Sequence, residues 1–233
     1  MKKQSALVLA LCLFALVLAM CLYSAPRLTQ EATAYAQAAP VVVIDAGHGG
    51  EDGGASSPDG VLESGLNLQF ALRMRDLLQF AGVETMMLRE TDTALYTDGC
   101  SGIAEKKVSD LKNRVALING TPGALLVSIH QNSLPSHPST HGAQVFFNAV
   151  DPAGEVAQGV QQALNVSLDG GKTVKAMDGG VYLMKQIRCP GVLVECGFLS
   201  NDKEAAHLQT EEHQRRLAAA ILAGLLQYST KEG

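Results

Sequence analysis

The sequence predicts an α/β fold, with a single domain built on a central, twisted, mostly parallel sheet that helices flank on both faces. Apolar runs of strand length alternate along the chain with segments that carry apolar residues at helical spacing. Several of these runs are apolar at almost every position, as in parallel strands that are buried on both faces. Beyond an N-terminal segment, roughly 190 residues remain, which suits one domain with a full core. Strands that alternate with helices favour a layered α/β architecture.

The N-terminal segment is typical of a targeting sequence. Two lysines precede a run at residues 6–22 that contains no charged residue. A positive start followed by an apolar run indicates an export signal, and a run of about 17 residues is near the lower limit for a membrane span. We therefore expect a signal peptide or membrane anchor at residues 1–25, a polar linker at 26–40, and a domain at 41–230 that lies outside the membrane.

Each expected strand is a short apolar run that ends at polar residues or glycine. Runs of this length between turn signals are typical of buried strands. The segment at residues 169–180 is rich in glycine and is expected to be a mobile loop. The strands are expected at residues 41–45, 83–88, 124–129, 142–147, 181–184 and 192–194.

Four segments carry apolar residues three or four positions apart, which predicts helices with one buried face. A glycine directly follows the first and closes the second, as is common at helix ends. Between these two helices, residues 98–107 are expected to form a polar insertion. The helices are expected at residues 66–81, along the stripe from Leu111 to Ile118, at 155–168 and at 210–228.

Polar residues follow three of the expected strands. His48 comes after the first strand between glycines, His130 directly follows the strand at 124–129, and Glu195 follows the last strand. In open α/β sheets, ligands bind outside the carboxyl ends of the strands, so we expect these three side chains to lie close together. A carboxylate as near the core as Glu195 has to be paired, bound to a metal or shifted in its pKa.

Glu63, near the start of the first helix, completes a candidate zinc site. Two histidines and one glutamate are a ligand set that catalytic zinc uses, with a fourth position left for water. Each residue alone has an ordinary structural explanation, such as a favourable charge at a helix start. Their combination predicts that His48, Glu63 and His130 bind Zn²⁺ and that Glu195 moves protons beside it.

The remaining polar candidates are assigned to supporting or surface positions. Asp45 ends a strand and is expected to orient a ligand from behind, and Asp52 is expected near the site. The three cysteines beyond the N-terminal run lack disulfide or zinc-finger spacing and are expected to be free thiols. A net charge of −5 without a basic run in the domain argues against a nucleic-acid partner. Four histidines are expected on the solvated surface, namely His137, His141, His207 and His213.

Four motifs occur in the order found in one family of bacterial cell-wall hydrolases. They are residues 45–55, Glu63 with Asn67 and Leu68, residues 128–132 and residues 195–201. They resemble zinc-dependent N-acetylmuramoyl-L-alanine amidases, and the likeness runs from about residue 41 to 228. The resemblance implies that His48, Glu63 and His130 are zinc ligands and that Glu195 is the catalytic acid/base. The reaction it implies is hydrolysis of the amide bond between N-acetylmuramic acid and L-alanine in peptidoglycan. Ser64 and Cys196 depart from the family pattern, but neither replaces one of these four residues.

Three further segments, at residues 89–92, 110–114 and 181–184, look most like the spore-cortex members of the family. That resemblance implies a role in cortex maturation and germination, in which a partner deacetylase forms muramic lactam. It also implies that the protein acts outside the cytoplasm, between the forespore membranes. An activator lipoprotein would be compatible with this resemblance. The alternatives are a vegetative cell-separation amidase, a zinc carboxypeptidase that acts on stem peptides, and a wall-binding module without activity.

Overall fold

The computed structural model describes residues 13, 14, 16–20, 23, 40–168, 171–176 and 181–229. The chain divides into two compact units, Met1–Ala39 and Pro40–Gly233. In the first unit the few described residues are helical, and most of the expected signal or anchor and linker lies outside the described residues. Among the residues that are described, no helix has both the length and the apolar character that crossing a membrane requires.

The second unit is built on one six-stranded sheet with the strand order β2-β1-β3-β6-β4-β5. Strands β2, β1, β3 and β6 run parallel to one another, whereas β4 is antiparallel to β6 and β5 is parallel to β4. The sheet is therefore mostly parallel, as the sequence predicts. The strands are β1 (Val41–Ala46), β2 (Thr85–Met87), β3 (Ala124–Asn132), β4 (Gln144–Phe147), β5 (Lys175–Ala176) and β6 (Gly191–Phe198).

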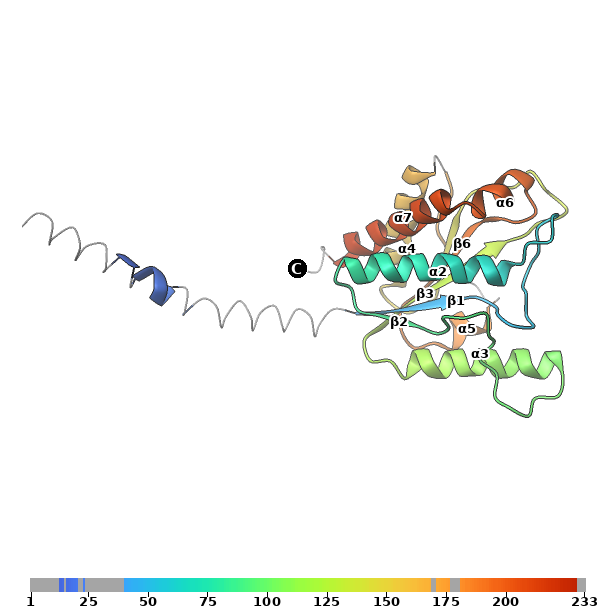
Figure 1. Ribbon diagram of the computed structural model, residues 1–233, viewed down its shortest axis with the longest axis horizontal. Coiled ribbons are helices and arrows are strands. Elements are labelled where there is room, and N and C mark those ends of the chain that lie inside the picture. Colours follow the sequence, from blue (N-terminus) through green and yellow to red (C-terminus); the bar gives the residue numbers. More distant parts are fainter. Residues whose placement is uncertain are drawn as a thin grey trace, which may run out of the picture. The chain divides into compact units, whose positions relative to one another are not determined.

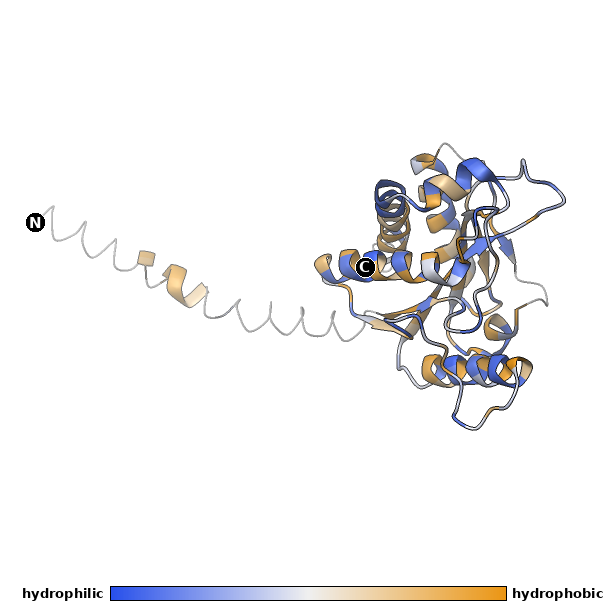
Figure 2. Cartoon of the chain, turned by 45° about the vertical axis from the view of Figure 1, so that its right-hand side comes forward, coloured by the Kyte–Doolittle hydropathy of each residue, from blue (hydrophilic) through white to orange (hydrophobic). Residues whose placement is uncertain are grey.

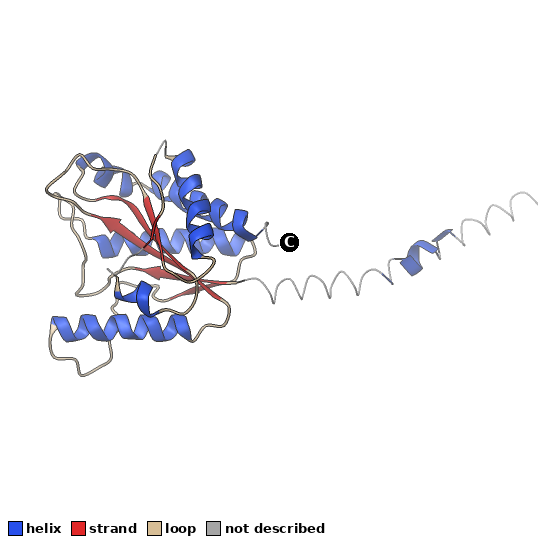
Figure 3. Ribbon diagram, turned by 180° about the vertical axis from the view of Figure 1, so that it is seen from behind, coloured by secondary structure: helices blue, strands red, loops and turns tan. Residues whose placement is uncertain are grey.

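Helices cover both faces of this sheet, which confirms the predicted architecture (Figures 1 and 3). Figure 1 shows α2 and α7 on one side of the strands and α3 and α5 on the other. The fourth long helix, α4, packs against α7. The helices are α2 (Glu63–Phe80), α3 (Ile103–Asn119), α4 (Ala153–Ser167), α5 (Tyr182–Gln186), α6 (Asp202–Leu208) and α7 (Glu211–Ser229).

Two apolar clusters, one on each face, hold the three layers together. Ile44 of β1, Phe70 of α2 and Leu217 of α7 belong to the larger cluster, and all three are fully buried. Val43, next along β1, belongs with Ile118 of α3 to the smaller one. Neighbouring residues of a strand thus face opposite layers. Figure 2 shows both polar and apolar residues along the covering helices, as expected for helices that bury one face.

The structure corrects three details of the prediction. Residues 181–184, predicted as a strand, belong to the short helix α5, because a short apolar run fits a buried helix turn as well as a strand. The polar insertion at 98–107 is half helix, since α3 already begins at Ile103. Helix α6 was not predicted, because its seven residues carry too few apolar positions to show a period. The three cysteines among the described residues, Cys100, Cys189 and Cys196, are free as expected, and Cys196 is buried.

Two boundaries matter for the site. Helix α2 begins at Glu63 rather than near Leu66, and strands β3 and β6 run beyond His130 and Glu195. The backbone N–H groups of Glu63 and Ser64 donate to the carbonyl oxygens of Ala55 and Gly53, at 2.9 and 3.0 Å. These contacts satisfy amide groups that a helix start leaves free, and they fix Glu63 against the loop that follows β1.

Candidate metal centre

Three side chains from distant parts of the chain meet at the carboxyl ends of β1 and β3. His48 follows β1, Glu63 opens α2, and His130 lies near the end of β3. The Nε2 atom of His48 lies 3.3 Å from Glu63 Oε2, and the Nδ1 atom of His130 lies 2.9 Å from Glu63 Oε1. One ligand atom from each residue lies within 4.8 Å of the other two, so a single metal ion could contact all three. The sequence predicted this convergence from the ends of the strands.

The packing of the two imidazoles leaves the site open on one side. Their ring centroids are 5.1 Å apart with an angle of 77° between the planes. The side chains of His48 and His130 remain 20% and 19% exposed, whereas the side chain of Glu63 is only 5% exposed. Glu63 therefore forms the floor of the centre, and the imidazoles border the solvent, where a substrate could approach.

Glycines give the ligands the space to meet. A Cβ atom on Gly47 would lie 2.2 Å from Cε1 of His130, and one on Gly54 would lie 2.5 Å from Oε2 of Glu63. His48 itself has a φ of 62°, in the left-handed region that residues with a side chain rarely adopt. The loop after β1 thus holds a strained histidine between residues that cannot carry a side chain, which is typical of a functional site.

Glu63 is held as an ionised carboxylate. Its Oε2 atom accepts a hydrogen bond from the backbone N–H of Ala55 at 2.8 Å, and its Oε1 atom accepts one from the backbone N–H of Gln131 at 3.1 Å. Burial alone would raise the pKa of Glu63, but the hydrogen bonds with His130 and His48 outweigh it and hold the pKa well below its usual range. An ionised carboxylate between two imidazoles is a donor set that fits a divalent cation of the zinc type.

Glu195 lies beside this donor set on the neighbouring strand. It is directly opposite His130 in the register between β3 and β6. Its Oε2 atom is buried and has no hydrogen-bond partner among the described residues. Burial raises the pKa of Glu195 to about 7, and the negative charge of Glu63 adds to this effect, while His130 and His48 oppose it. A carboxyl group of this kind can take up and release a proton near neutral pH.

Comparison with known proteins supports the same chemistry. Residues 42–227 match the N-acetylmuramoyl-L-alanine amidase family, which is most of the chain. The chain belongs to this family. It is 39% identical over 194 residues to the germination-specific N-acetylmuramoyl-L-alanine amidase of Bacillus subtilis strain 168, an alignment that covers 83% of this chain and 81% of the relative.

Solved amidase structures share the fold. The CwlD amidase from Clostridioides difficile, solved in complex with the GerS lipoprotein, superposes with a TM-score of 0.77 at 34% identity, over 83% of this chain and 100% of that one. An N-acetylmuramoyl-L-alanine amidase from Clostridium difficile 630 gives a TM-score of 0.73 at 29% identity, over 84% and 99% of the two chains. The family resemblance seen in the sequence is therefore confirmed.

Asp52 fixes one histidine of the amidase centre. Its Oδ2 atom lies 2.9 Å from Nδ1 of His48, and Lys107 contacts the same carboxylate at 3.2 Å. Burial opposes ionisation of Asp52, but the interactions with His48 and Lys107 outweigh it and lower the pKa of the carboxyl group. The ring orientation that results turns Nε2 of His48 toward Glu63, as a carboxylate behind a ligating histidine commonly does.

Asp45, expected to orient a ligand from behind, is linked to His48 through Arg114 rather than by a hydrogen bond of its own. Its buried carboxylate pairs with Arg114 of α3 and accepts a hydrogen bond from the hydroxyl of Ser128 at 2.7 Å. Arg114 in turn donates to the carbonyl oxygens of Ala46 at 3.1 Å and of His48 at 2.7 Å. Asp45 therefore acts through Arg114 on the loop that follows β1 and carries His48.

Arg89 is the second support of this loop, and sequence reasoning from residue types assigned no role to either arginine. The buried guanidinium of Arg89 donates to the carbonyl oxygens of Ala46, Gly47 and Ser64 at 2.8, 3.0 and 2.9 Å. It thereby ties the loop after β1 to the first turn of α2. No local pattern marks such a residue, because its partners in this loop and in α2 lie 25 or more positions away in the chain.

The four histidines expected on the surface of the amidase are placed less uniformly than the sequence suggested. His137, His141 and His207 are exposed, but His213 is half-buried. His141, His207 and His213 border one hollow on the side of α4, α6 and α7. None of the four belongs to the group that could hold a metal ion, which among the described residues consists of His48, Glu63 and His130.

Proposed function

We propose that this amidase is zinc-dependent and hydrolyses the bond between N-acetylmuramic acid and L-alanine, with Zn²⁺ held by His48, Glu63 and His130. The observation that carries the proposal is the convergence of these three donors beside a carboxyl oxygen of Glu195 that is buried and unpartnered. Structural sites usually surround zinc with four protein ligands, whereas three ligands on a partly exposed rim leave a position for water or substrate.

Bound zinc supplies a Lewis acid that polarises the amide carbonyl and makes water a better nucleophile near neutral pH. Glu195 takes the proton from the attacking water. It then delivers this proton to the nitrogen of L-alanine, which would otherwise be a poor leaving group. Asp52 keeps the His48 ring oriented, and Arg89 and Arg114 keep its backbone in place.

Product analysis with soluble muropeptides tests the reaction. The domain without its N-terminal segment is incubated with a disaccharide peptide, with zinc and after chelation. We expect a free amino group on L-alanine and an intact disaccharide, and we expect chelation to abolish the product. Release of the terminal residue of the stem peptide would instead show a carboxypeptidase, and an unaltered substrate under all conditions would leave only a binding module.

We further propose a role in the spore cortex, because the germination-specific relative aligns over most of both chains. Removal of the peptide from muramic acid would prepare the sugar for a partner deacetylase that forms muramic lactam. A deletion strain should then produce spores that lack muramic lactam and germinate poorly. A normal cortex together with chains of unseparated cells would instead identify a vegetative cell-separation amidase.

The site of action is proposed to be outside the cytoplasm, with residues 6–22 as a membrane anchor. The CwlD structure was solved in complex with the GerS lipoprotein, and we propose that a lipoprotein binds and activates the present amidase. Cell fractionation with N-terminal sequencing of the mature protein tests the anchor, because a soluble form that starts near residue 37 would identify a cleaved signal. Co-purification with lipoproteins of the same cell tests the partner.

A further inference from the structure

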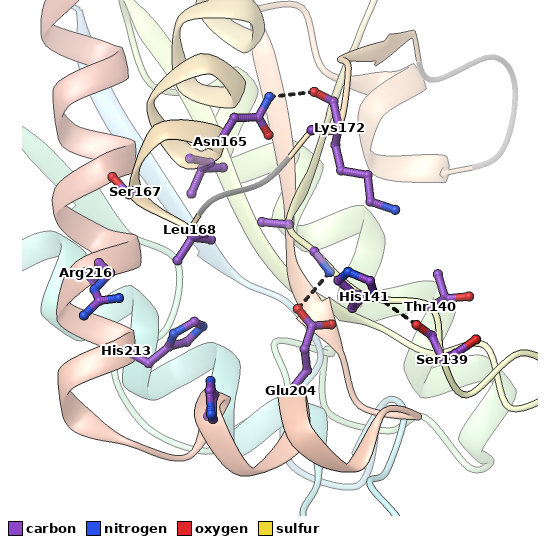
Figure 4. A pocket seen from close by; sticks show the side chains of 15 residues that line it. Ser139, Thr140, His141, Asn165, Ser167, Leu168, Lys172, Glu204, His213 and Arg216 are labelled. Carbon is purple, nitrogen blue, oxygen red and sulfur yellow. Dashed lines mark hydrogen bonds between the residues drawn. The ribbon is translucent and has the colours of Figure 1, made fainter.

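A hollow of about 610 Å³ opens at some distance along the sheet from the metal centre (Figure 4). Its walls come from the loop before β4, the end of α4, the segment at Lys172, and helices α6 and α7. A neighbouring hollow of about 670 Å³ shares His141, Glu204 and His207 with it. The two hollows thus adjoin through shared lining residues, and the hydrolysis of an amide bond does not by itself explain them.

Basic groups line this hollow, although the protein carries a net charge of −5. Lys172 and Arg216 contribute permanent positive charges, and His141, His207 and His213 contribute imidazoles. Burial lowers the pKa of His213, and the positive groups His207 and Arg216 lower it further. Lys172 and Arg216 thus place two permanent positive charges at the hollow, which favours an anionic ligand.

Glu204 is the one acidic residue among the described residues that line the first hollow, whereas Asp202 and Lys203 border the neighbouring one. Glu204 accepts hydrogen bonds from the backbone N–H groups of Gly142 and Phe198, each at 2.8 Å, so both of its oxygens are used within the fold. Among the described residues, no carboxylate lies within ion-pair distance of Lys172.

Lys172 is instead held in place for a ligand. The side chain of Asn165 donates to its backbone carbonyl at 2.7 Å, and its Nζ lies 5.6 Å from the centre of the Phe198 ring. Figure 4 shows its side chain directed into the hollow, toward the side where His141 and Glu204 lie. Arg216 makes an exposed pair with Glu212 at 3.2 Å, which is weak enough to give way to another anion.

The hollow is connected to the catalytic edge of the sheet through β4 and β6. Gln144 is paired with Glu195 in the antiparallel register, and Gly142, which lines the hollow, precedes Gln144 by two residues. Paired residues are about 5 Å apart and two residues of strand span roughly 7 Å, so the near wall lies about 10 Å from the backbone of Glu195. About three residues of an extended peptide cover that distance.

We propose that the hollow binds carboxylates of the peptidoglycan stem peptide while the amide bond of L-alanine lies at the metal centre. This inference rests on the proposed function. The second residue of the stem is a glutamate linked through its γ-carboxyl group, so its α-carboxylate is free, and the third residue carries a carboxylate as well. Lys172 and Arg216 form charge-assisted hydrogen bonds with these groups, and the polar rim accommodates the rest of the peptide.

The test compares a double variant with a matched control on two forms of the peptide. The variant is Lys172→Gln with Arg216→Gln. The control is Lys112→Gln with Arg215→Gln, which makes the same change in net charge at exposed positions outside the hollow. Arg215, like Arg216, pairs with the glutamate four residues before it. The peptides are L-alanyl-γ-D-glutamyl-diaminopimelate with free carboxylates and the same peptide with carboxamides, both as free peptides and attached to the disaccharide.

Two readouts keep this inference separate from the proposed reaction. Calorimetry with the free peptides measures binding without chemistry, and we expect the variant to bind the carboxylate form about tenfold more weakly than the control does. With the disaccharide peptides, we expect the same increase in KM and a smaller change in kcat, with little effect on the carboxamide form. Equal binding by variant and control, or equal losses for both peptide forms, would overturn the inference. Absence of hydrolysis by the unaltered protein would reject the proposed reaction, and calorimetry would still decide about the hollow.

Discussion

At the scale of single residues, the candidate metal centre depends on glycines, which have no side chain, as much as on the three residues that could bind the ion. Gly47 and Gly54 approach His130 and Glu63 so closely that a methyl group would overlap with them. The histidine between these glycines accepts an unfavourable φ of 62°. Such strain costs on the order of 1–3 kcal/mol and persists only where the surroundings enforce it.

Gly47→Ala is therefore expected to impair metal binding more than folding. The new Cβ would lie 2.2 Å from His130 Cε1, so the imidazole has to leave its position. We expect at least a tenfold loss of zinc affinity, as for other disturbances around metal ligands, measured by competition with a chelator. The control is Gly65→Ala in α2, where a Cβ meets open space. That change should leave zinc affinity unaltered and stabilise the helix by about 0.5–1 kcal/mol.

Glu195→Gln separates proton transfer from metal binding. Glutamine keeps the shape of the side chain but cannot take a proton from water, so we expect kcat to fall by ~10²-fold or more. Metal analysis and circular dichroism should show normal zinc content and an intact fold. Near-normal turnover would contradict the role of Glu195 and would point to Asp52, the other carboxylate beside the ligands.

At the scale of elements, two arginines join helices to the end of β1. Arg114 of α3 pairs with Asp45 and reaches the carbonyl oxygen of His48, whereas Arg89 bridges the same loop to the start of α2. Both side chains are buried, so their charges and hydrogen bonds must be satisfied inside the protein. The position of the proposed metal ligands thus depends on contacts between layers, in addition to the strands and the helix that carry them.

Arg114→Met should destabilise the domain strongly. Removal of one partner leaves the buried carboxylate of Asp45 uncompensated, and such changes cost about 3–5 kcal/mol. Unfolding in urea measures the loss, and Arg188→Met at an exposed position serves as the control with a change within about 0.5 kcal/mol. Adding Asp45→Asn to Arg114→Met should restore part of the stability, and a further loss would show that the pair is not the cause.

The ion pair between Asp45 and Arg114 also predicts how the free energy of unfolding depends on pH. Burial by itself would raise the pKa of Asp45, but Arg114 and the hydrogen bonds outweigh it and lower the pKa below its usual value. The folded state therefore keeps this group ionised where the unfolded chain, with a pKa of about 3.9, takes up a proton. Its contribution is complete above that value and is lost as the pH falls toward the folded pKa. The difference in unfolding free energy between the unaltered protein and Asp45→Asn should shrink from pH 7 to pH 3, and a constant difference would contradict the assignment.

At the scale of the whole molecule, a metal ion would join three segments that the chain places far apart. His48, Glu63 and His130 come from the end of β1, the start of α2 and the end of β3. An ion bound to all three in the folded state and to fewer in the unfolded state stabilises the fold by mass action. Metal binding at this centre would therefore contribute to the stability of the folded domain as well as to the reaction.

Zinc added to chelator-treated protein is accordingly expected to raise the melting temperature. At a free concentration of 100 times Kd, the gain is about 2.7 kcal/mol, or roughly 5–10 °C for a domain of this size. His130→Ala should abolish most of this shift, whereas His137→Ala, at an exposed histidine outside the centre, should retain it. A full shift in His130→Ala would show that zinc binds elsewhere.

The sequence by itself determined the α/β class and the edge of the sheet at which the site lies. Apolar runs alternating with helical spacing require buried strands between helices, and polar residues at the ends of such runs have to meet at one edge. His48, His130 and Glu195 could be selected in this way, and Glu63 at a helix start completed a zinc ligand set that the family motifs also imply. These features depend on local periodicity, which can be read from the sequence without knowing which residues are in contact.

Only the tertiary structure decided which groups support that edge. Arg114 and Asp45 are 69 positions apart, and Arg89 reaches Ala46 over 43 positions, so no local pattern connects them. Residues 181–184 form a helix turn rather than a strand for the same reason, because Leu183 and Met184 fill the space under α3 that the chain alone does not reveal. The basic hollow likewise gathers side chains from five separate segments. Long-range packing fixes each of these features, since burial of a charge or an apolar side chain depends on partners that only the folded chain brings together.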